Sequence, residues 1–271
     1  AGAGATAAVP VLHATGGREW DAPEADQGVA VDAESLYAID NAVIARYPRA
    51  GGPRRALWDG RGGALVHLNS CTVGGDVLWC AHSNYPAVPM ASSVEIFDRR
   101  TLAPRDSHSF GYMAEGSLVW LDRQESGWLA GFAHYDGRGG EPGRPQRYSS
   151  VVSFDPKWRR TGGWLFPDAV LERMAPYAAS GGAVGPDGWL YVMGHDRPEM
   201  YVLGRPAQGP TLVHLATIEL PAEGQAFSWA PESRSVFVVL RRLGRIRQID
   251  IPPLPAELRE RALPFADPAP R

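Results

Sequence analysis

Lysine is nearly absent from this chain, and no long apolar segment occurs in it. Its 27 basic residues are all arginines except Lys157, and against 30 acidic residues they leave a net charge of −3. So small a net charge gives no reason to expect a nucleic acid or an anionic membrane as partner. No apolar run approaches the ~20 residues of a membrane-spanning helix. The sequence therefore predicts neither a nucleic-acid partner nor a membrane span.

Three common catalytic or nucleotide-binding motifs are also missing. The chain has no Gly-x-Ser-x-Gly nucleophile elbow, no Gly-Lys-Ser/Thr phosphate loop and no Cys-x-x-Cys pair. Glycine-rich pieces such as Gly-Pro-Asp-Gly at 185–188 are typical of turns and need no nucleotide. Serine-hydrolase, P-loop and dithiol-redox chemistry therefore have no support in the sequence.

Only two cysteines occur, Cys71 and Cys80. A two-residue turn at 75–76 would place them opposite each other at a non-hydrogen-bonded pair of a hairpin, with Cα atoms ~4.5 Å apart. A disulfide tolerates that separation, and two buried free thiols are the alternative. The chain starts on Ala-Gly-Ala-Gly-Ala-Thr without Met, as after signal-peptide removal, although a shortened sequence would start the same way. A bridge and a removed signal together predict a periplasmic or extracellular protein.

Glycine and proline are plentiful, with 31 and 24 residues, and they separate short apolar runs. This pattern is typical of many short strands joined by turns. Five similar units follow one another. Their first strands are predicted at 27–32, 64–69, 117–122, 182–187 and 226–231. Second strands are predicted at 36–40, 77–82, 128–134, 189–195 and 236–241, third strands at 43–47, 93–97, 150–154, 200–203 and 245–249, and weaker fourth strands at 56–58, 106–110, 163–166 and 212–218.

The fifth unit lacks a fourth strand, because the chain turns proline-rich at 251–255. The N-terminal segment 9–15 can supply the missing strand, which removes exposed sheet edges. The whole pattern resembles a β-propeller. That resemblance implies one all-β domain over 1–271 with five four-stranded blades, in which 1–16 contributes the closing strand and 252–271 is a proline-rich tail. Six blades are the alternative, and one short helix is predicted within 255–263.

The longest predicted loops gather on one face of the ring, which we call the loop-rich face. In an antiparallel blade, the first strand starts and the second strand ends on this face, and the connections between blades also run there. Its loops at 84–92, 135–148 and 167–180 are much longer than the turns of the opposite face. Binding and catalysis tend to occupy such loops on a rigid scaffold. The loop-rich face is therefore the predicted functional face.

Three of the seven histidines end second strands, at His82, His134 and His195. If the ring brings them together, they can hold one divalent transition metal (Zn, Mn, Fe, Cu or Ni) and leave a position open for a water or substrate oxygen. The alternative is that each histidine bonds to neighbouring loops, since second strands lie ~4.8 Å farther from the axis than first strands. His67 falls in the middle of a predicted first strand and is expected in the core.

Other polar residues accompany the histidines on the loop-rich face. Glu115, Tyr135 and Arg241 are the predicted catalytic residues, because a carboxylate or phenol can move a proton and a guanidinium can hold an anionic group. The predicted substrate-binding residues are Asn84, Tyr85, Asp136, Asp196 and Gln225.

These residues support two hypotheses about function. The first is a metal-dependent propeller enzyme, a lyase, isomerase or hydrolase, with a small-molecule or carbohydrate substrate. The second is a non-catalytic propeller that binds a partner protein or ligand through the loop-rich face. Architecture does not choose between them, because one fold supports many functions.

Overall fold

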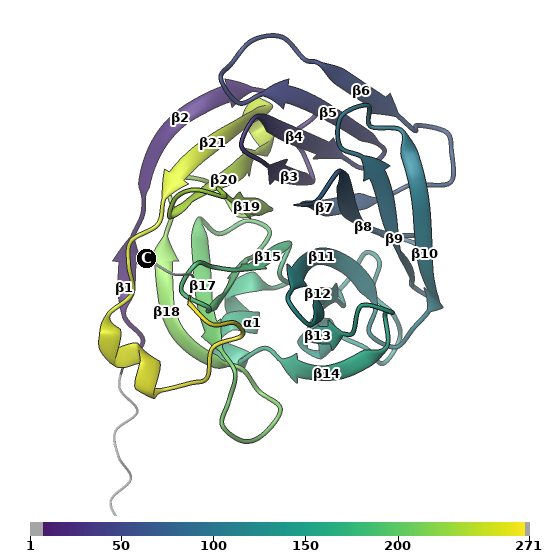
Figure 1. Ribbon diagram of the computed structural model, residues 1–271. Helices are drawn as coiled ribbons and strands as arrows, with labels where there is room; N and C mark the ends of the chain where they lie inside the picture. Colours follow the sequence, from purple (N-terminus) through teal and green to yellow (C-terminus); the bar gives the residue numbers. More distant parts are fainter. Residues whose placement is uncertain (1–7, 269–271) are drawn as a thin grey trace, which may run out of the picture.

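Five sheets stand in a ring around a central axis, so the chain is an all-β propeller with five blades (Figure 1). The computed structural model describes residues 8–268. The predicted fold class is confirmed. Among these residues, no helix has the length and apolar character that crossing a membrane would require.

Four strands make up each blade, and the first strand lies nearest the axis. The first strands are β3 (Gly28–Val31), β7 (Leu68–Gly74), β11 (Ser117–Gln124), β15 (Gly181–Val184) and β19 (Phe227–Trp229). The second strands are β4 (Ser35–Asp40), β8 (Val77–Ser83), β12 (Gly127–Ala133), β16 (Leu190–Met193) and β20 (Ser235–Leu240). The third strands are β5 (Val43–Pro48), β9 (Ala91–Asp98), β13 (Ser150–Phe154), β17 (Glu199–Gly204) and β21 (Arg245–Asp250). The outermost strands are β6 (Ala56–Asp59), β10 (Pro104–Tyr112), β14 (Arg160–Leu165), β18 (Val213–Glu219) and β2 (Thr15–Asp21).

Helical segments are short and lie in the connections. The helix α1 (Asp168–Met174) occupies the long link between β14 and β15 on the loop-rich face. Three single turns of 3-10 helix are η1 (Gln146–Tyr148), η2 (Arg241–Leu243) and η3 (Ala256–Glu260). The last is the short helix predicted within 255–263.

The strand that closes the ring differs from the predicted one. Residues Thr15–Asp21 form β2, which pairs antiparallel with β21 and completes the fifth blade. The expected segment 9–15 instead contains β1 (Val11–His13), which pairs in parallel with β18 of the fourth blade. Trp20 explains the difference: it is buried against Phe237 at a ring distance of 5.4 Å and its Nε1 donates to the Arg49 carbonyl at 2.9 Å. That aromatic anchor fixes the strand that carries it as the closing strand.

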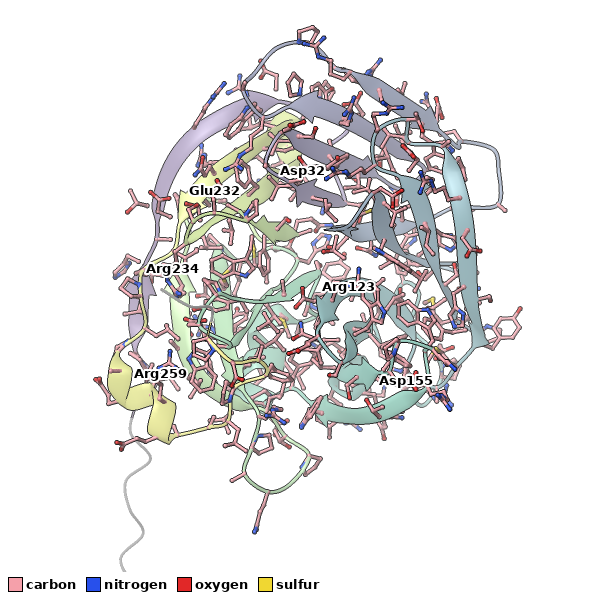
Figure 2. The ribbon with its side chains drawn as sticks, viewed as in Figure 1. Asp32, Arg123, Asp155, Glu232, Arg234 and Arg259 are labelled. Carbon is pink, nitrogen blue, oxygen red and sulfur yellow. A yellow bond between two sulfur atoms is a disulfide. The ribbon has the colours of Figure 1, made fainter. Side chains whose placement is uncertain are left out.

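Ion pairs also tie the fifth blade to both of its neighbours. Arg49 of the first blade binds the Glu232 carboxylate with two guanidinium nitrogens, and Arg234 lies 2.9 Å from an Asp187 oxygen of the fourth blade. Figure 2 labels Glu232 and Arg234 among the side chains of the turns. Partly exposed pairs of this kind are worth about 1 kcal/mol or less each. Ring closure therefore depends mainly on apolar packing between blades.

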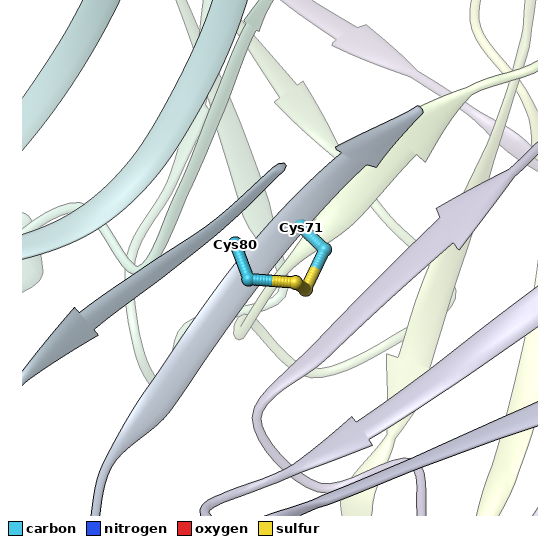
Figure 3. The surroundings of a disulfide bond; sticks show 2 residues. All are labelled: Cys71 and Cys80. Atoms are coloured by element: carbon cyan, nitrogen blue, oxygen red, sulfur yellow. A yellow bond between two sulfur atoms is a disulfide. The ribbon is translucent and has the colours of Figure 1, made fainter. Parts of the chain in front are cut away.

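The predicted disulfide joins Cys71 of β7 to Cys80 of β8 (Figure 3). The two residues are direct partners in the hairpin register, with Cα atoms 4.0 Å apart. Counting from the turn at 75–76 therefore gave the correct pair. Both cysteines are buried in the core between the first two blades.

Removing this bridge is expected to destabilise the protein by about 2–3 kcal/mol, the value for closing a loop of about ten residues in the unfolded chain. The variant is Cys71→Ala/Cys80→Ala, measured by denaturant unfolding against the oxidised wild type. Dithiothreitol should lower the stability of the wild type and leave that of the variant unchanged. An equal effect of the reductant on both proteins would show that the bridge does not contribute.

Candidate functional site

A cavity of about 570 Å³ opens at the centre of the loop-rich face. All five blades contribute to its wall at or near the start of their first strands. These residues are Gln27, Asn69, Val119, Ser180 and Gln225. The ring therefore brings side chains from distant parts of the sequence to one polar mouth, as the repeat pattern predicted.

A closed set of polar contacts forms one side of the mouth. Gln225 Nε2 donates to Gln27 Oε1 at 3.1 Å, and Gln27 Nε2 donates to Asp26 Oδ2 at 2.9 Å. Arg241 then bridges the ends, with NH1 3.5 Å from Gln225 Oε1 and Nε 3.4 Å from Asp26 Oδ1. Because Gln225 is buried, these partners are what compensate for the loss of water around its amide.

His195 belongs to the same side of the cavity. Its Nδ1 lies 2.8 Å from Asp196 Oδ1, and its Nε2 lies 2.7 Å from NH1 of Arg241. A guanidinium can only donate, so Nε2 is the acceptor and the proton is on Nδ1. The ring also packs on Tyr177 at a centroid distance of 4.2 Å. His195 is thus a neutral positioning group between an arginine and a tyrosine.

His67 is also a positioning group of the cavity and is held by hydrogen bonds to its neighbours. Its Nδ1 lies 2.6 Å from Asn41 Oδ1, and Asn69 Nδ2 donates to its Nε2 at 3.1 Å. Burial, followed by the nearby His82, lowers the pKa of His67 to about 4, so the ring is neutral near pH 7. Tyr85 packs against it at 4.8 Å.

His82 lies outside this cavity, and both of its ring nitrogens have protein partners. The Val66 N–H donates to Nε2 at 3.2 Å, and Nδ1 lies 2.9 Å from Ser93 Oγ, which in turn donates to Glu95 at 2.6 Å. Burial lowers the pKa of His82 to about 4. The residue therefore holds the segment before β7 against the second blade.

His134 is likewise buried away from the cavity lining. Its Nε2 donates to the Ala114 carbonyl at 2.9 Å, and its Nδ1 lies 3.6 Å from Glu141. Burial is the largest cause of its lowered pKa. Glu141 also accepts from the Met90 N–H at 2.7 Å, so this pair links two loops of neighbouring blades.

Of the eleven predicted site residues, five line the cavity. They are Tyr85, Tyr135, His195, Gln225 and Arg241. The Tyr85 and Tyr135 rings pack at 4.9 Å, and burial raises the pKa of the Tyr135 phenol. Its hydroxyl therefore stays protonated and can only donate or accept a hydrogen bond near neutral pH.

The other predicted residues mainly stabilise the loops around the cavity. Glu115 pairs with Arg160 at 2.8 Å. Asn84 closes its own loop through bonds to Pro89 and Ala91, Asp136 accepts from the Gln146 N–H at 3.0 Å, and Asp196 binds His195. None of these four lines the cavity.

Several lining residues were missed, and His67 is the instructive one. The predicted strand 64–69 places it in the core, but β7 starts at Leu68 and has an irregular register between Leu68 and Cys71. His67 therefore lies before the strand, at the mouth. The disulfide pairing could have revealed this, since a strand that reaches 74 and starts at 64 is too long for a blade. Asn41 directly follows a predicted second strand and shares the repeat position of the histidines, whereas Arg138 and Tyr177 lie within long loops that have no repeat.

No protein-family model and no curated protein sequence matches this chain. Solved structures are similar to it in fold. The β-propeller domain of Cps50 (Swd1) from Myceliophteria thermophila is 13% identical with a TM-score of 0.46, over 83% of this chain and 82% of that chain. The WD40 repeats of RRP9 are 12% identical (TM-score 0.45; 83% and 67%), and the WD40 β-propeller domain of Doa1 is 10% identical (TM-score 0.45; 83% and 78%). At these identities the likeness concerns the architecture alone.

The prediction of a metal-dependent lyase, isomerase or hydrolase is wrong. The three histidines expected to form its reaction centre do not converge: His195 lines the cavity, whereas His82 and His134 are bound in the packing of the loops. The predicted small-molecule or carbohydrate substrate is wrong for the same reason.

The divalent metal stays a prediction without support from the geometry. In the part of the chain that the structure describes, no group of three or more His, Cys, Asp or Glu side chains is placed to hold an ion. Hydrogen bonds to Ser93, Ala114 and Arg241 occupy nitrogens of the three histidines that a metal would need.

Proposed function

We propose that this chain is a non-catalytic propeller that binds a partner protein through its loop-rich face. The observation that carries the proposal is the distribution of exposed apolar side chains. Four large ones lie in the loops of this face: Leu243 is 61% exposed, Val66 51%, Tyr148 50% and Val88 48%.

On the opposite face, the exposed large apolar side chain is that of Leu263, which is 47% exposed in the C-terminal tail beside Arg205. Among residues 8–268, no exposed large apolar side chain lies in the turns that join first to second strands or third to fourth strands. Single exposed apolar residues are common, but a group on one face surrounding a cavity is typical of a protein interaction site. The four residues come from three different blades and the link before β7, so a partner covering them would span the mouth.

These residues also lie in loops on a rigid scaffold, which favours the binding of a partner. The scaffold beneath them is rigid, because the second strand of each blade is largely buried and is paired on both sides. A partner can therefore bind without ordering the blades, which keeps the entropic cost of association low. The polar cavity at the centre then provides a place for one inserted side chain.

The proposal predicts that charge placed in this apolar surface abolishes peptide capture. The probe is a phage-displayed library of random twelve-residue peptides, selected on the immobilised wild-type protein. Val88→Asp/Leu243→Asp should reduce binding of the selected peptides by about tenfold or more, because it buries charge in the contact. Leu57→Asp, at a 42% exposed position on the outer strand β6, is the matched control and should bind normally.

Hydrogen exchange then locates the contact. Bound peptide should protect amides at 84–90 and 241–244 and leave the turns of the opposite face unchanged. A library that yields no binders, or binders that protect only the outer strands, would contradict the proposed function.

We also propose a periplasmic or extracellular location. The Cys71–Cys80 bridge supports it, because structural disulfides persist mainly in oxidising compartments.

A further inference from the structure

The cavity at the mouth carries positive charge that its own lining does not neutralise. Two arginines, Arg138 and Arg241, line it, and no aspartate or glutamate does. Arg241 is paired with Asp26 just outside the lining, at 3.4 Å. Arg138 forms no ion pair with any carboxylate of residues 8–268 within the 4.0 Å limit. One guanidinium charge is therefore left for a ligand.

The contacts of His195 and the low pKa of His67 are those of uncharged rings. His195 accepts a hydrogen bond from Arg241 through Nε2, which only a neutral imidazole can do. His67 is neutral because burial holds its pKa at about 4. Arg138 is therefore the lining arginine that has no ion-pair partner, whereas Asp26 and Asp196 lie just outside the lining beside Arg241 and His195.

The loop that carries Arg138 is packed closely against Tyr85. The next residue, Gly139, has φ +77°, and a Cβ atom on it would lie 2.4 Å from Tyr85 Cε2. Only glycine allows this approach. The pKa of the Tyr85 phenol reflects the same surroundings: burial raises it most, the Arg138 charge lowers it, and Tyr177 raises it. Arg138, Tyr85 and Tyr177 all line the cavity, and as a cluster they can offer hydrogen-bond donors to a ligand.

We propose that this cluster binds an acidic side chain, an aspartate or glutamate, of the partner protein. This inference rests on the proposed function. A single unbalanced guanidinium matches the single charge of a carboxylate better than the nearly double charge of a phosphate. The donors are side-chain groups, as in arginine sites that recognise acidic motifs, whereas capture of a chain terminus uses backbone N–H groups.

The test uses two displayed libraries that differ in one residue. Both carry ten randomised positions around a fixed central residue, which is glutamate in one library and glutamine in the other, and both are fused so that no free C-terminal carboxylate exists. The wild-type protein should enrich the glutamate library. For a selected peptide, Glu→Gln in the peptide and Arg138→Gln in the protein should each weaken binding by about tenfold. The double change should cost no more than either alone, because both remove the same contact.

Arg242→Gln is the matched control. Arg242 is an exposed arginine of the same face, but it pairs with Glu223 at 3.0 Å and does not line the cavity. Its replacement should change affinity less than twofold. Equal enrichment of the two libraries, or losses from Glu→Gln and Arg138→Gln that add, would overturn the acidic-side-chain proposal and leave the proposed function standing. A third library with free C-termini separates the remaining outcomes. If it alone yields binders, the acidic-side-chain proposal is overturned in favour of a terminal carboxylate; if none of the three libraries is enriched, the proposed function itself fails.

Discussion

Replacing Trp120 by alanine is expected to lower the free energy of unfolding by about 3–5 kcal/mol, the cost typical of deleting a buried tryptophan side chain. Trp120 of β11 is fully buried in the core shared by the third and fourth blades. Its indole lies against two glycines, one from each blade. A Cβ atom on Gly131 of β12 or Gly182 of β15 would come within 2.0 Å or 2.4 Å of the ring. The side chain therefore joins two blades, and its loss opens a cavity that neither glycine can fill.

Two further variants test this account in denaturant unfolding. Trp120→Phe keeps most of the ring and should cost about 1–2 kcal/mol, since the indole Nε1 has no hydrogen-bond partner to lose. Gly182→Ala should destabilise the wild type by about 1–3 kcal/mol through overpacking. In the Trp120→Ala background the same alanine has room and should cost little or stabilise. Additive losses in the double variant would show that the ring does not lie against Gly182 in solution.

The strands that the sequence predicted best are the second and third of each blade. Those at 43–47, 150–154 and 245–249 agree with β5, β13 and β21 to within one residue. They succeed because each is a short run of apolar or alternating apolar and polar residues next to turn residues. First strands are less regular, since they pack against one another near the axis and begin wherever the blade connection ends. The connection before β7 runs to His67, so this strand starts four residues later than the predicted start at 64.

The site was harder to predict for a geometric reason. His82, His134 and His195 align in the repeat, but they occupy different positions relative to their strand ends. His82 lies inside β8, His134 is one residue past β12, and His195 is two residues past β16. Successive side chains of a strand point to opposite faces, so a shift of one residue redirects the ring. The alignment of the repeats therefore correctly predicted that polar side chains from all blades meet at the mouth. The prediction that the three histidines converge there was wrong.

Stability is expected to fall by several kcal/mol as the pH is lowered from about 6.5 to 4. The pKa values of His67 and His82 are about 4 in the folded protein, because burial disfavours the charged rings, against 6.5 for an exposed histidine. Between these values the unfolded chain binds protons that the folded protein excludes, so acid favours unfolding. Each imidazole contributes up to about 3 kcal/mol, which is fully present above pH 6.5 and lost by pH 4. Burial also lowers the pKa of His134 and His214, which adds to the effect.

Asp122 has the opposite effect on the pH dependence of stability. The contribution of the histidines is therefore measured in a variant that lacks this carboxyl. Burial raises the pKa of the Asp122 carboxyl to about 7, against bonds from the Val184 N–H at 2.9 Å and Gln124 at 2.6 Å. The folded protein then binds a proton that the unfolded chain releases, so this group stabilises the fold as the pH falls from about 7 towards 3.8. Asp122→Asn should therefore raise stability at pH 8 and steepen the loss of stability between pH 6.5 and 4.

Urea unfolding of Asp122→Asn at several pH values between 8 and 4.5 measures the histidine contribution. Adding His82→Gln should remove a large share of the remaining slope, because the amide keeps polar contacts to Ser93 and Val66 but does not titrate. If His82→Gln leaves the slope of the Asp122→Asn protein intact, the ring of His82 is hydrated in solution. The contact that holds the segment before β7 in place at the mouth is then weaker than the structure indicates, since a hydrated imidazole cannot remain the buried acceptor of the Val66 N–H.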